Sequence, residues 1–252
     1  MRLDKFLAEK YSSRTKAAQA IEEGYVTVNG CKVSPSYEYK EGDALEFTAP
    51  QERFVSNGGY KLSKALKDFN FSVKGKVFID VGASNGGFTD CLLQNGASKV
   101  YCIDVGESQL DKSLLDKNVV VVDNFNARNL GADTFKEKID GAVIDVSFIS
   151  LTYVLGNVTA VIDDGDYIIA LIKPQFECES KNVGKRGIVK EANIHKKVIT
   201  KIYTFAQSVG LATADLTEAP IKSGKNIEYL ILLRKHSEQI KQLSDIIKYV
   251  KL

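Results

Sequence analysis

The sequence contains few of the side chains that build metal centres and disulfide frameworks. Its 252 residues include four cysteines and two histidines. The cysteines form no Cys-x-x-Cys pair, which argues against a disulfide framework and a zinc site and predicts cytosolic thiols. The two histidines, His195 and His236, are too few for a histidine metal cluster, and they also argue against a Ser-His-Asp triad. We therefore expect no metal.

The sequence also lacks an uninterrupted apolar segment long enough to cross a membrane. The most apolar long region, Leu151 to Ile172, is broken by Asp163, Asp164 and Asp166, and the N-terminal stretch has no apolar core of a secretion signal. We expect a cytoplasmic protein with no membrane partner. The formal net charge is only +2, so any interaction with nucleic acid has to be argued from local charge placement.

The most informative feature that is present is a glycine-rich loop. Val77 to Ile79 predicts a strand, and Asp80 to Phe88 follows it, ahead of a helix-like stretch. Glycines let a ligand approach the main chain, at the edge where open parallel sheets bind ligands. Ser84 replaces the second glycine of the Gly-x-Gly-x-x-Gly pattern, which weakens a pyrophosphate-binding interpretation. The cofactor-binding candidates in this loop are Asp80, Gly82, Ala83, Ser84, Gly86, Gly87 and Phe88.

Short β-branched runs follow the loop and alternate with helix-length segments. They lie at Lys99–Val105, Val119–Asp123, Asp140–Val146 and Tyr167–Ile172, and Glu228–Leu233 predicts a last, edge strand. This alternation predicts an α/β domain in which helices cover both faces of a parallel sheet.

Charged residues stand at the carboxyl ends of several predicted strands, where open sheets bind ligands. These residues are Asp80, Asp104, Asp123, Asp145 and Lys173. Asp104 closes the second strand, at the distance from the glycine loop where an acid binds the ribose hydroxyls of a cofactor. The alternative is an aspartate that only caps the following turn.

The first 52 residues have a different pattern. Apolar residues recur at helical spacing from residue 3 to 11, and Ser12 or Ser13 can cap a second helix that Gly24 ends. Residues 25–30 predict a strand entering an Asn-Gly turn, with further strands at 32–33 and 44–47. We expect a small α+β domain over residues 1–52, a linker over 53–59, and a second domain over 60–252 that opens with a helix near Tyr60.

Two helices, the Val28-Asn29-Gly30 hairpin and the Gly42-Asp43 turn resemble the S-four-type RNA-binding module. The resemblance implies that basic side chains of this domain meet RNA phosphates, a contact that positions RNA without reading its sequence. The candidates are Arg2, Lys5, Arg14 and Lys16. The alternative is that these are solvated helix charges.

Five motifs behind this module resemble the TlyA family, in that family's order. They are Asp80–Asp90, Ile103–Gly106, Asn126–Arg128, Asp145–Ser150 and Ile172–Glu177. The resemblance implies an FtsJ-like, Rossmann-like domain that uses S-adenosylmethionine to methylate the ribose 2′-hydroxyl of a cytidine in ribosomal RNA, within a ribosomal subunit. It adds Asn126 to the cofactor-binding candidates. The short N-terminus resembles that of family members acting on large-subunit RNA only.

The family's Lys-Asp-Lys-Glu tetrad corresponds here to Lys61, Asp145, Lys173 and Glu228. A ribose hydroxyl is a weak nucleophile, so its proton needs an acceptor or its developing charge needs cationic partners; burial can also lower the pKa of a lysine enough to make it a base. We expect Lys173 nearest the hydroxyl, Asp145 and Glu228 holding the two ammonium groups, and Lys61 tuning the charge. The alternative is a pair of structural ion bridges.

A basic segment follows the second tetrad lysine and has little predicted structure. Lys185 and Arg186 lie in it and are candidates for clamping RNA phosphates; a solvated loop is the alternative.

Asn57 stands where the family often has arginine, which puts one RNA contact near the linker in doubt.

Three rival functions remain at this point. A pseudouridine synthase behind the same module would need a Gly-Arg-Leu-Asp-like catalytic motif, which the second domain does not contain. A binding-only factor would carry the methyltransferase fold without turnover. A membrane-active, haemolysin-like protein would need a signal, a spanning segment or a strongly amphipathic basic helix, and the sequence offers none of these.

Overall fold

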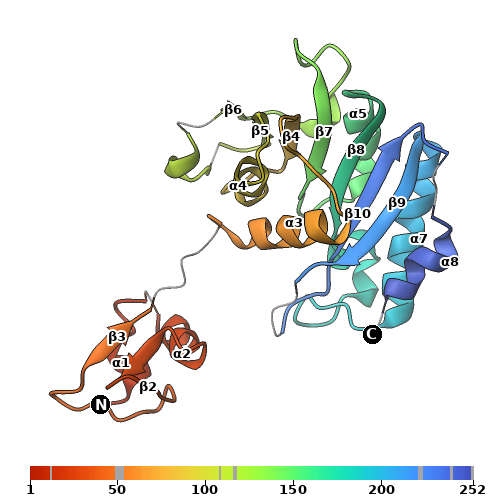
Figure 1. Ribbon diagram of the computed structural model, residues 1–252. Coiled ribbons are helices and arrows are strands. Elements are labelled where there is room, and N and C mark those ends of the chain that lie inside the picture. Colours follow the sequence, from red (N-terminus) through yellow and green to blue (C-terminus); the bar gives the residue numbers. More distant parts are fainter. Residues whose placement is uncertain are drawn as a thin grey trace. The chain divides into compact units, whose positions relative to one another are not determined.

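The structure is a computed structural model that describes residues 1–11, 13–48, 54–107, 109–115, 118–220, 224–238 and 241–250. The chain divides into two compact units, Met1–Arg53 and Phe54–Leu252, each drawn in Figure 1. Ser12 and Arg53, which the sequence placed in a helix cap and in the linker, lie outside the described residues, as does the side chain of Lys16.

The first unit is a three-stranded antiparallel sheet with two helices. Strand β1 pairs with both neighbours, in the order β2-β1-β3, and the predicted Asn29-Gly30 turn joins β1 to β2 with positive φ at both residues. The first helix is shorter than the expected stretch of residues 3–11. The elements are α1 (Leu3–Phe6), α2 (Arg14–Glu22), β1 (Val26–Val28), β2 (Cys31–Lys32) and β3 (Leu45–Phe47).

The second unit contains a seven-stranded sheet of order β6-β5-β4-β7-β8-β10-β9. Its strands are β4 (Val77–Val81), β5 (Lys99–Ile103), β6 (Val119–Val122), β7 (Ile139–Ile144), β8 (Ile162–Ile172), β9 (Leu211–Glu218) and β10 (Tyr229–Lys235). Its α-helices are α3 (Asn57–Asp68), α4 (Gly87–Gln94), α5 (Leu155–Thr159), α6 (Pro174–Glu177), α7 (Ala192–Ser208) and α8 (Leu243–Ile246). Short 3-10 turns are η1 (Lys112–Leu114), η2 (Ala127–Asn129), η3 (Leu151–Tyr153), η4 (Ser180–Asn182) and η5 (Ile247–Tyr249).

The sheet differs from the expectation in two ways. The five strands from β6 to β8 are parallel, but β10 is antiparallel to both β8 and β9, so the sheet is mixed. The strand expected at Glu228–Leu233 was predicted at the edge, which is wrong: β10 lies between β8 and β9, and β9 forms the edge. The helix expected near Tyr60 begins at Asn57.

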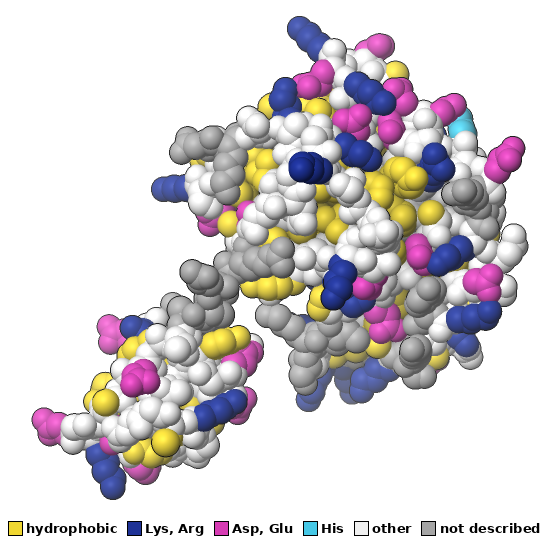
Figure 2. Space-filling view, in the orientation of Figure 1, with side chains coloured by type: hydrophobic (Ala, Val, Ile, Leu, Met, Phe, Trp, Pro, Cys, Tyr) yellow, Lys and Arg dark blue, Asp and Glu magenta, His cyan; other side chains and the backbone are white. Residues whose placement is uncertain are grey.

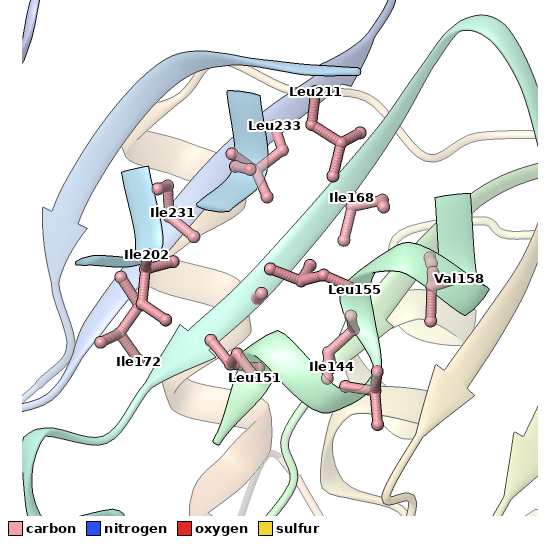
Figure 3. Close-up of a cluster of buried hydrophobic side chains, with 14 of the residues drawn as sticks. Ile144, Leu151, Leu155, Val158, Ile168, Ile172, Ile202, Leu211, Ile231 and Leu233 are labelled. Carbon is pink, nitrogen blue, oxygen red and sulfur yellow. The ribbon is translucent and has the colours of Figure 1, made fainter. Parts of the chain in front are cut away.

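Successive side chains along each strand point to opposite faces of the sheet and pack into two separate cores, as expected for a sheet covered on both faces. In β8, Ile168 and Ile172 pack with α5 and α7, whereas Ile169 and Leu171 pack with α3 and α4. Figure 1 shows α3 and α4 on one side of the sheet and α7 on the other. Figure 3 shows the first core, where Ile202 of α7 meets the sheet.

On the faces shown in Figure 2, basic and acidic side chains are interspersed. No helix in the described part of the chain is long and apolar enough to span a bilayer. The four cysteines are free thiols, and burial raises the pKa of Cys102 to about 12.

Candidate active site

The glycine-rich loop joins β4 to α4 and borders an open pocket at the carboxyl ends of the strands. Gly82 and Gly86 have φ of 83° and 85°, and Ser84 between them has φ of 47°. The pocket is lined by Ser56, Gly58, Asp80, Gly82, Ala83, Ser84, Asn85, Gly87, Phe88, Asp145, Ser147 and Lys173. It therefore collects six of the seven loop candidates and two members of the tetrad.

The glycines are required chiefly by the protein's own packing. A Cβ on Gly82 would lie 2.7 Å from the carbonyl oxygen of Asp145, and one on Gly87 would lie 2.1 Å from Oγ of Ser56. Both distances are far below ordinary contact. The expectation that these glycines leave room for a ligand is thus incomplete, because they first let β4 approach β7 and let α4 approach the start of α3.

Asp80 is buried inside β4, one residue before its end, and not at the strand end. Its Oδ2 accepts a hydrogen bond from Thr89 Oγ1 at 2.7 Å, while Oδ1 is buried and has no protein partner. Burial, reinforced by the charge of Asp145, raises the pKa of the Asp80 carboxyl to about 7. The pocket thus contains a carboxyl group with one acceptor oxygen free.

Three other cofactor candidates make contacts within the protein and do not line the pocket. Asp104 follows β5, and its carboxylate accepts from the amides of Ser84 (3.0 Å) and Gly106 (3.2 Å), so it supports the glycine loop from the neighbouring strand. Asn126 caps η2 through its side chain. A Cβ on Gly86 would meet the side chain of Leu114 at 2.5 Å.

Sheet topology brings three members of the proposed tetrad to one edge. Asp145 follows β7 and Lys173 follows its parallel neighbour β8. Glu228 directly precedes β10, whose first residue, Tyr229, pairs with Ile172, the last residue of β8. The expectation that Asp145 and Lys173 end neighbouring strands is confirmed.

The four side chains form two ion pairs. Lys173 Nζ pairs with Asp145 Oδ1, and Lys61 Nζ on α3 pairs with Glu228 Oε2 at 2.6 Å. The lysine side chains are 11% and 22% exposed, respectively, so both pairs are largely shielded from water and weakly screened. Each carboxylate holds one ammonium group, as expected.

Sequence reasoning missed several side chains of this site. Gln175 on α6 donates from Nε2 to Glu228 Oε1 at 3.0 Å, and Ser147 accepts from Lys173 Nζ at 2.7 Å. Phe148 is 86% exposed and has φ of 65°, a rare backbone state for a bulky residue. These residues fall within the motifs quoted above, but a motif does not show which of its side chains face the pocket.

The segment between α6 and α7 contains one 3-10 turn, η4, in a stretch where the sequence predicted little structure. Lys185 and Arg186 are exposed at a turn, residues 184–187, which we call the basic turn. Asn226 fixes this turn: its Oδ1 accepts from the amide of Val189 at 2.9 Å, and its Nδ2 donates to the carbonyl of Gly187 at 2.7 Å.

His195 on α7 fixes the same segment from the other side. It is fully buried, and its Nε2 lies 3.0 Å from the carbonyl oxygen of Val189, so Nε2 carries the proton and donates. Nδ1 then accepts from the Tyr229 hydroxyl, also at 3.0 Å. Burial lowers the pKa of His195, which favours this neutral form. The basic turn is therefore tied to the residues beside Glu228.

In the first unit, two of the RNA-binding candidates share one acid. Arg2 and Arg14 both pair with the buried carboxylate of Asp4, at 2.9 and 3.1 Å, and they hold the pKa of Asp4 at about 2. Their side chains stay about half exposed. Lys5 is exposed.

Comparison with known proteins identifies both units. Residues 54–235 match the FtsJ-like methyltransferase family and residues 1–45 match the S4 domain. The chain is 40% identical to "Hemolysin A" of Brachyspira hyodysenteriae, covering 91% of this chain and 98% of that protein. It is 36% identical to "16S/23S rRNA (cytidine-2′-O)-methyltransferase TlyA" of Mycobacterium tuberculosis, covering 90% and 86%. The chain belongs to the TlyA/hemolysin A family.

Further relatives agree with this TlyA assignment. The "23S rRNA (cytidine-2′-O)-methyltransferase TlyA" of Campylobacter jejuni is 30% identical, covering 91% of this chain and 97% of that protein. A solved structure from Streptococcus thermophilus, provisionally described as a hemolysin, superposes with a TM-score of 0.76 at 36% identity, covering 99% of this chain and 95% of that one. The predicted fold class, a Rossmann-like methyltransferase domain behind a small RNA-binding domain, is confirmed.

The TlyA fold implies S-adenosylmethionine as cofactor, and the pocket fits this group. The donor carries an ammonium and a sulfonium charge, and the free, buried oxygen of Asp80 is an acceptor suited to a cation. Lys173 lines the same pocket. Within the described residues, no group of three or more His, Cys, Asp or Glu side chains is arranged to hold a metal ion.

Proposed function

We propose that this protein transfers a methyl group to the ribose 2′-hydroxyl of a cytidine in ribosomal RNA, within a ribosomal subunit. The observation that supports this most directly is the ion pair between Lys173 and Asp145, in the same pocket as the glycine loop. An ammonium group and a carboxylate beside a cofactor pocket suit an oxygen nucleophile, whose proton must leave while negative charge develops.

The charged residues of the site have separate roles in this methyl transfer. When bound, S-adenosylmethionine supplies a methyl group on a positively charged sulfur. Lys173, oriented by Asp145 and Ser147, donates a hydrogen bond to the 2′ oxygen and stabilises the charge that develops there. Asp145 provides a carboxylate acceptor for the hydroxyl proton. Glu228, held by Lys61 and Gln175, positions the second ammonium group.

The exposed ring of Phe148 suits an unpaired nucleobase. Its centroid lies 5.0 Å from the ring of Phe176, and Lys173 Nζ lies 5.9 Å from that second ring. Exposed aromatic rings stack on bases that have left a helix. We therefore assign Phe148 to the base of the target nucleotide, next to the lysine that meets its ribose.

We further propose large-subunit RNA as the substrate. The two relatives named above for cytidine-2′-O-methylation both include 23S rRNA in their names, whereas only one includes 16S rRNA. The first unit, which matches the S4 domain, and the basic turn would contact RNA phosphates through Arg2, Lys5, Arg14, Lys185 and Arg186.

A lysine substitution tests the proposed chemistry. In Lys173→Ala, we expect kcat for ribosomal RNA methylation to fall at least about 100-fold, with the Kd for S-adenosylmethionine within about twofold of the wild type, because the glycine loop is untouched. Lys136→Ala, an exposed lysine outside the pocket, is the matched control. Near-normal kcat in Lys173→Ala would remove Lys173 from the mechanism.

A further inference from the structure

The first turns of α7 present a polar and basic face that the tetrad does not use. Its members, here called the α7 basic face, line one cavity and are Asn193, Lys196, Lys197 and Thr200. They are three or four residues apart, so they lie on one side of the helix. The other side, which includes His195, Val198 and Ile199, is buried.

Two contacts place this part of α7 beside the active site. Lys201 Nζ donates to Glu177 Oε2 at 2.8 Å and to Ser150 Oγ at 3.1 Å, and Ser150 belongs to the segment that follows Asp145. On the other flank, His195 bonds Tyr229, the neighbour of Glu228. The start of α7 is therefore anchored to both segments that supply the tetrad's carboxylates.

Positive charge is concentrated in this region. Residues 179–201 contain seven lysines and arginines and only two acids, Glu179 and Glu191, an excess of five that exceeds the whole chain's net charge of +2. Lys181 pairs with Glu179, and the charges of Lys181 and Lys197 lower the pKa of Glu179. Lys196 and Lys197 are exposed and form no ion pair with an acid in the described part of the chain.

We propose that the α7 basic face binds the phosphate backbone of the RNA next to the target nucleotide. The inference rests on the proposed function and extends it, because it assigns a second phosphate contact in the methyltransferase unit. Two ammonium groups with an amide and a hydroxyl match the oxygens of a phosphodiester. A lipid surface fits less well, since none of the four side chains is an apolar group that could enter a bilayer.

Charge reversal at the two lysines tests this surface in the full chain. In Lys196→Glu with Lys197→Glu, we expect the KM for large ribosomal subunits to rise at least about tenfold, and the slope of log affinity against log salt to decrease by about two. We expect kcat and the Kd for S-adenosylmethionine to stay unchanged. The double glutamine variant should show a smaller rise in KM, and Lys112→Glu with Lys136→Glu, on exposed residues outside α7, should show none.

The outcomes separate this inference from the proposed function. If the wild type does not methylate ribosomal RNA at all, the proposed function fails. If the wild type methylates it but the Lys196→Glu, Lys197→Glu variant keeps the wild-type KM and salt slope, the α7 inference alone is wrong. Loss of binding to phosphatidylglycerol vesicles in that variant, with unchanged affinity for RNA, would assign the face to a membrane and also overturn the inference.

Discussion

Asp80 shows how one buried residue can couple cofactor binding to pH. Its carboxyl lies within a strand, with one oxygen bonded to Thr89 and the other free in the pocket. Burial raises its pKa from 3.8 to about 7, so near neutral pH a proton occupies a site that a cationic ligand would favour in ionised form. The free protein and the cofactor complex should therefore differ in the protonation of this residue.

The expected pH dependence follows from that difference. A bound cation favours ionised Asp80, so binding releases a proton when the pH lies below about 7. Calorimetry should show the Kd for S-adenosylmethionine rising by up to about tenfold per pH unit as the pH falls below about 7, and levelling above it. Asp80→Asn should weaken binding and remove this dependence. A pH-independent Kd in the wild type would contradict the assignment.

In the free protein, the raised pKa should make Asp80's contribution to stability fall as the pH rises from about 4 to about 7.

Phe148 gives a second prediction at this scale. Because its side chain is almost fully exposed, Phe148→Ala should leave the melting temperature within about 2 °C of the wild type, while the loss of stacking costs about 1–3 kcal/mol of RNA interaction. That corresponds to a fall in kcat/KM of roughly 5- to 150-fold. Phe148→Tyr should retain most activity, and Tyr153→Ala, another exposed aromatic, serves as control. Unchanged kcat/KM in Phe148→Ala would exclude a role in stacking.

At the scale of elements, strand order positions the chemistry. Asp145 and Lys173 directly follow the parallel strands β7 and β8, and Glu228 directly precedes antiparallel β10, so the carboxyl ends of two strands meet the amino end of a third at one edge of the sheet. Helix α7 then links this edge to the basic turn through His195. Removing this histidine should therefore affect RNA binding more than chemistry.

His195→Leu leaves the Val189 carbonyl and the Tyr229 hydroxyl without their buried partner. We expect the free energy of unfolding to fall by about 2–3 kcal/mol, measured by urea denaturation, and amide exchange around residue 187 to accelerate. The KM for RNA should rise more than kcat falls. In His195→Gln, the amide can both donate and accept, so part of the stability and part of the RNA affinity should return. A fall in kcat as large as the rise in KM in both variants would argue for a purely structural role.

Local sequence signals predicted the elements well where local chemistry decides them. The strand before Asp80, the Asn29-Gly30 turn and the carboxyl-end position of Lys173 all follow from short patterns. Strand β9 was missed because Leu211–Glu218 alternates alanine, threonine and acids and has little intrinsic strand preference. It forms a strand by pairing with β10, the next strand along the chain, and this pairing is not encoded in the composition of residues 211–218 themselves.

The glycine loop shows the same limit within the site. Its glycines were predicted from their spacing, but their physical reason is the close approach of β7 and α3, which depends on the folded arrangement. Partners such as Gln175 and Ser56 could not be selected for the same reason. The site's charged residues could be predicted, whereas the side chains that orient them could not.

At the scale of the whole molecule, the chain combines two units with separate cores and nearly balanced charge. Basic groups concentrate locally, at the paired arginines of the first unit and in residues 179–201 of the second. A protein with little net charge can in this way contact RNA phosphates at chosen places without binding polyanions indiscriminately. Shape and placement, more than total charge, should decide its partner.

The most direct test of the central claim is to incubate the protein with intact ribosomal subunits and labelled S-adenosylmethionine, and then to map the methylated nucleotide. We predict a single cytidine of the large-subunit RNA carrying the methyl group on its 2′ oxygen, and no such label with Lys173→Ala. Methylation of a base in place of the ribose, or no RNA methylation by a protein that binds the methyl donor, would contradict the account.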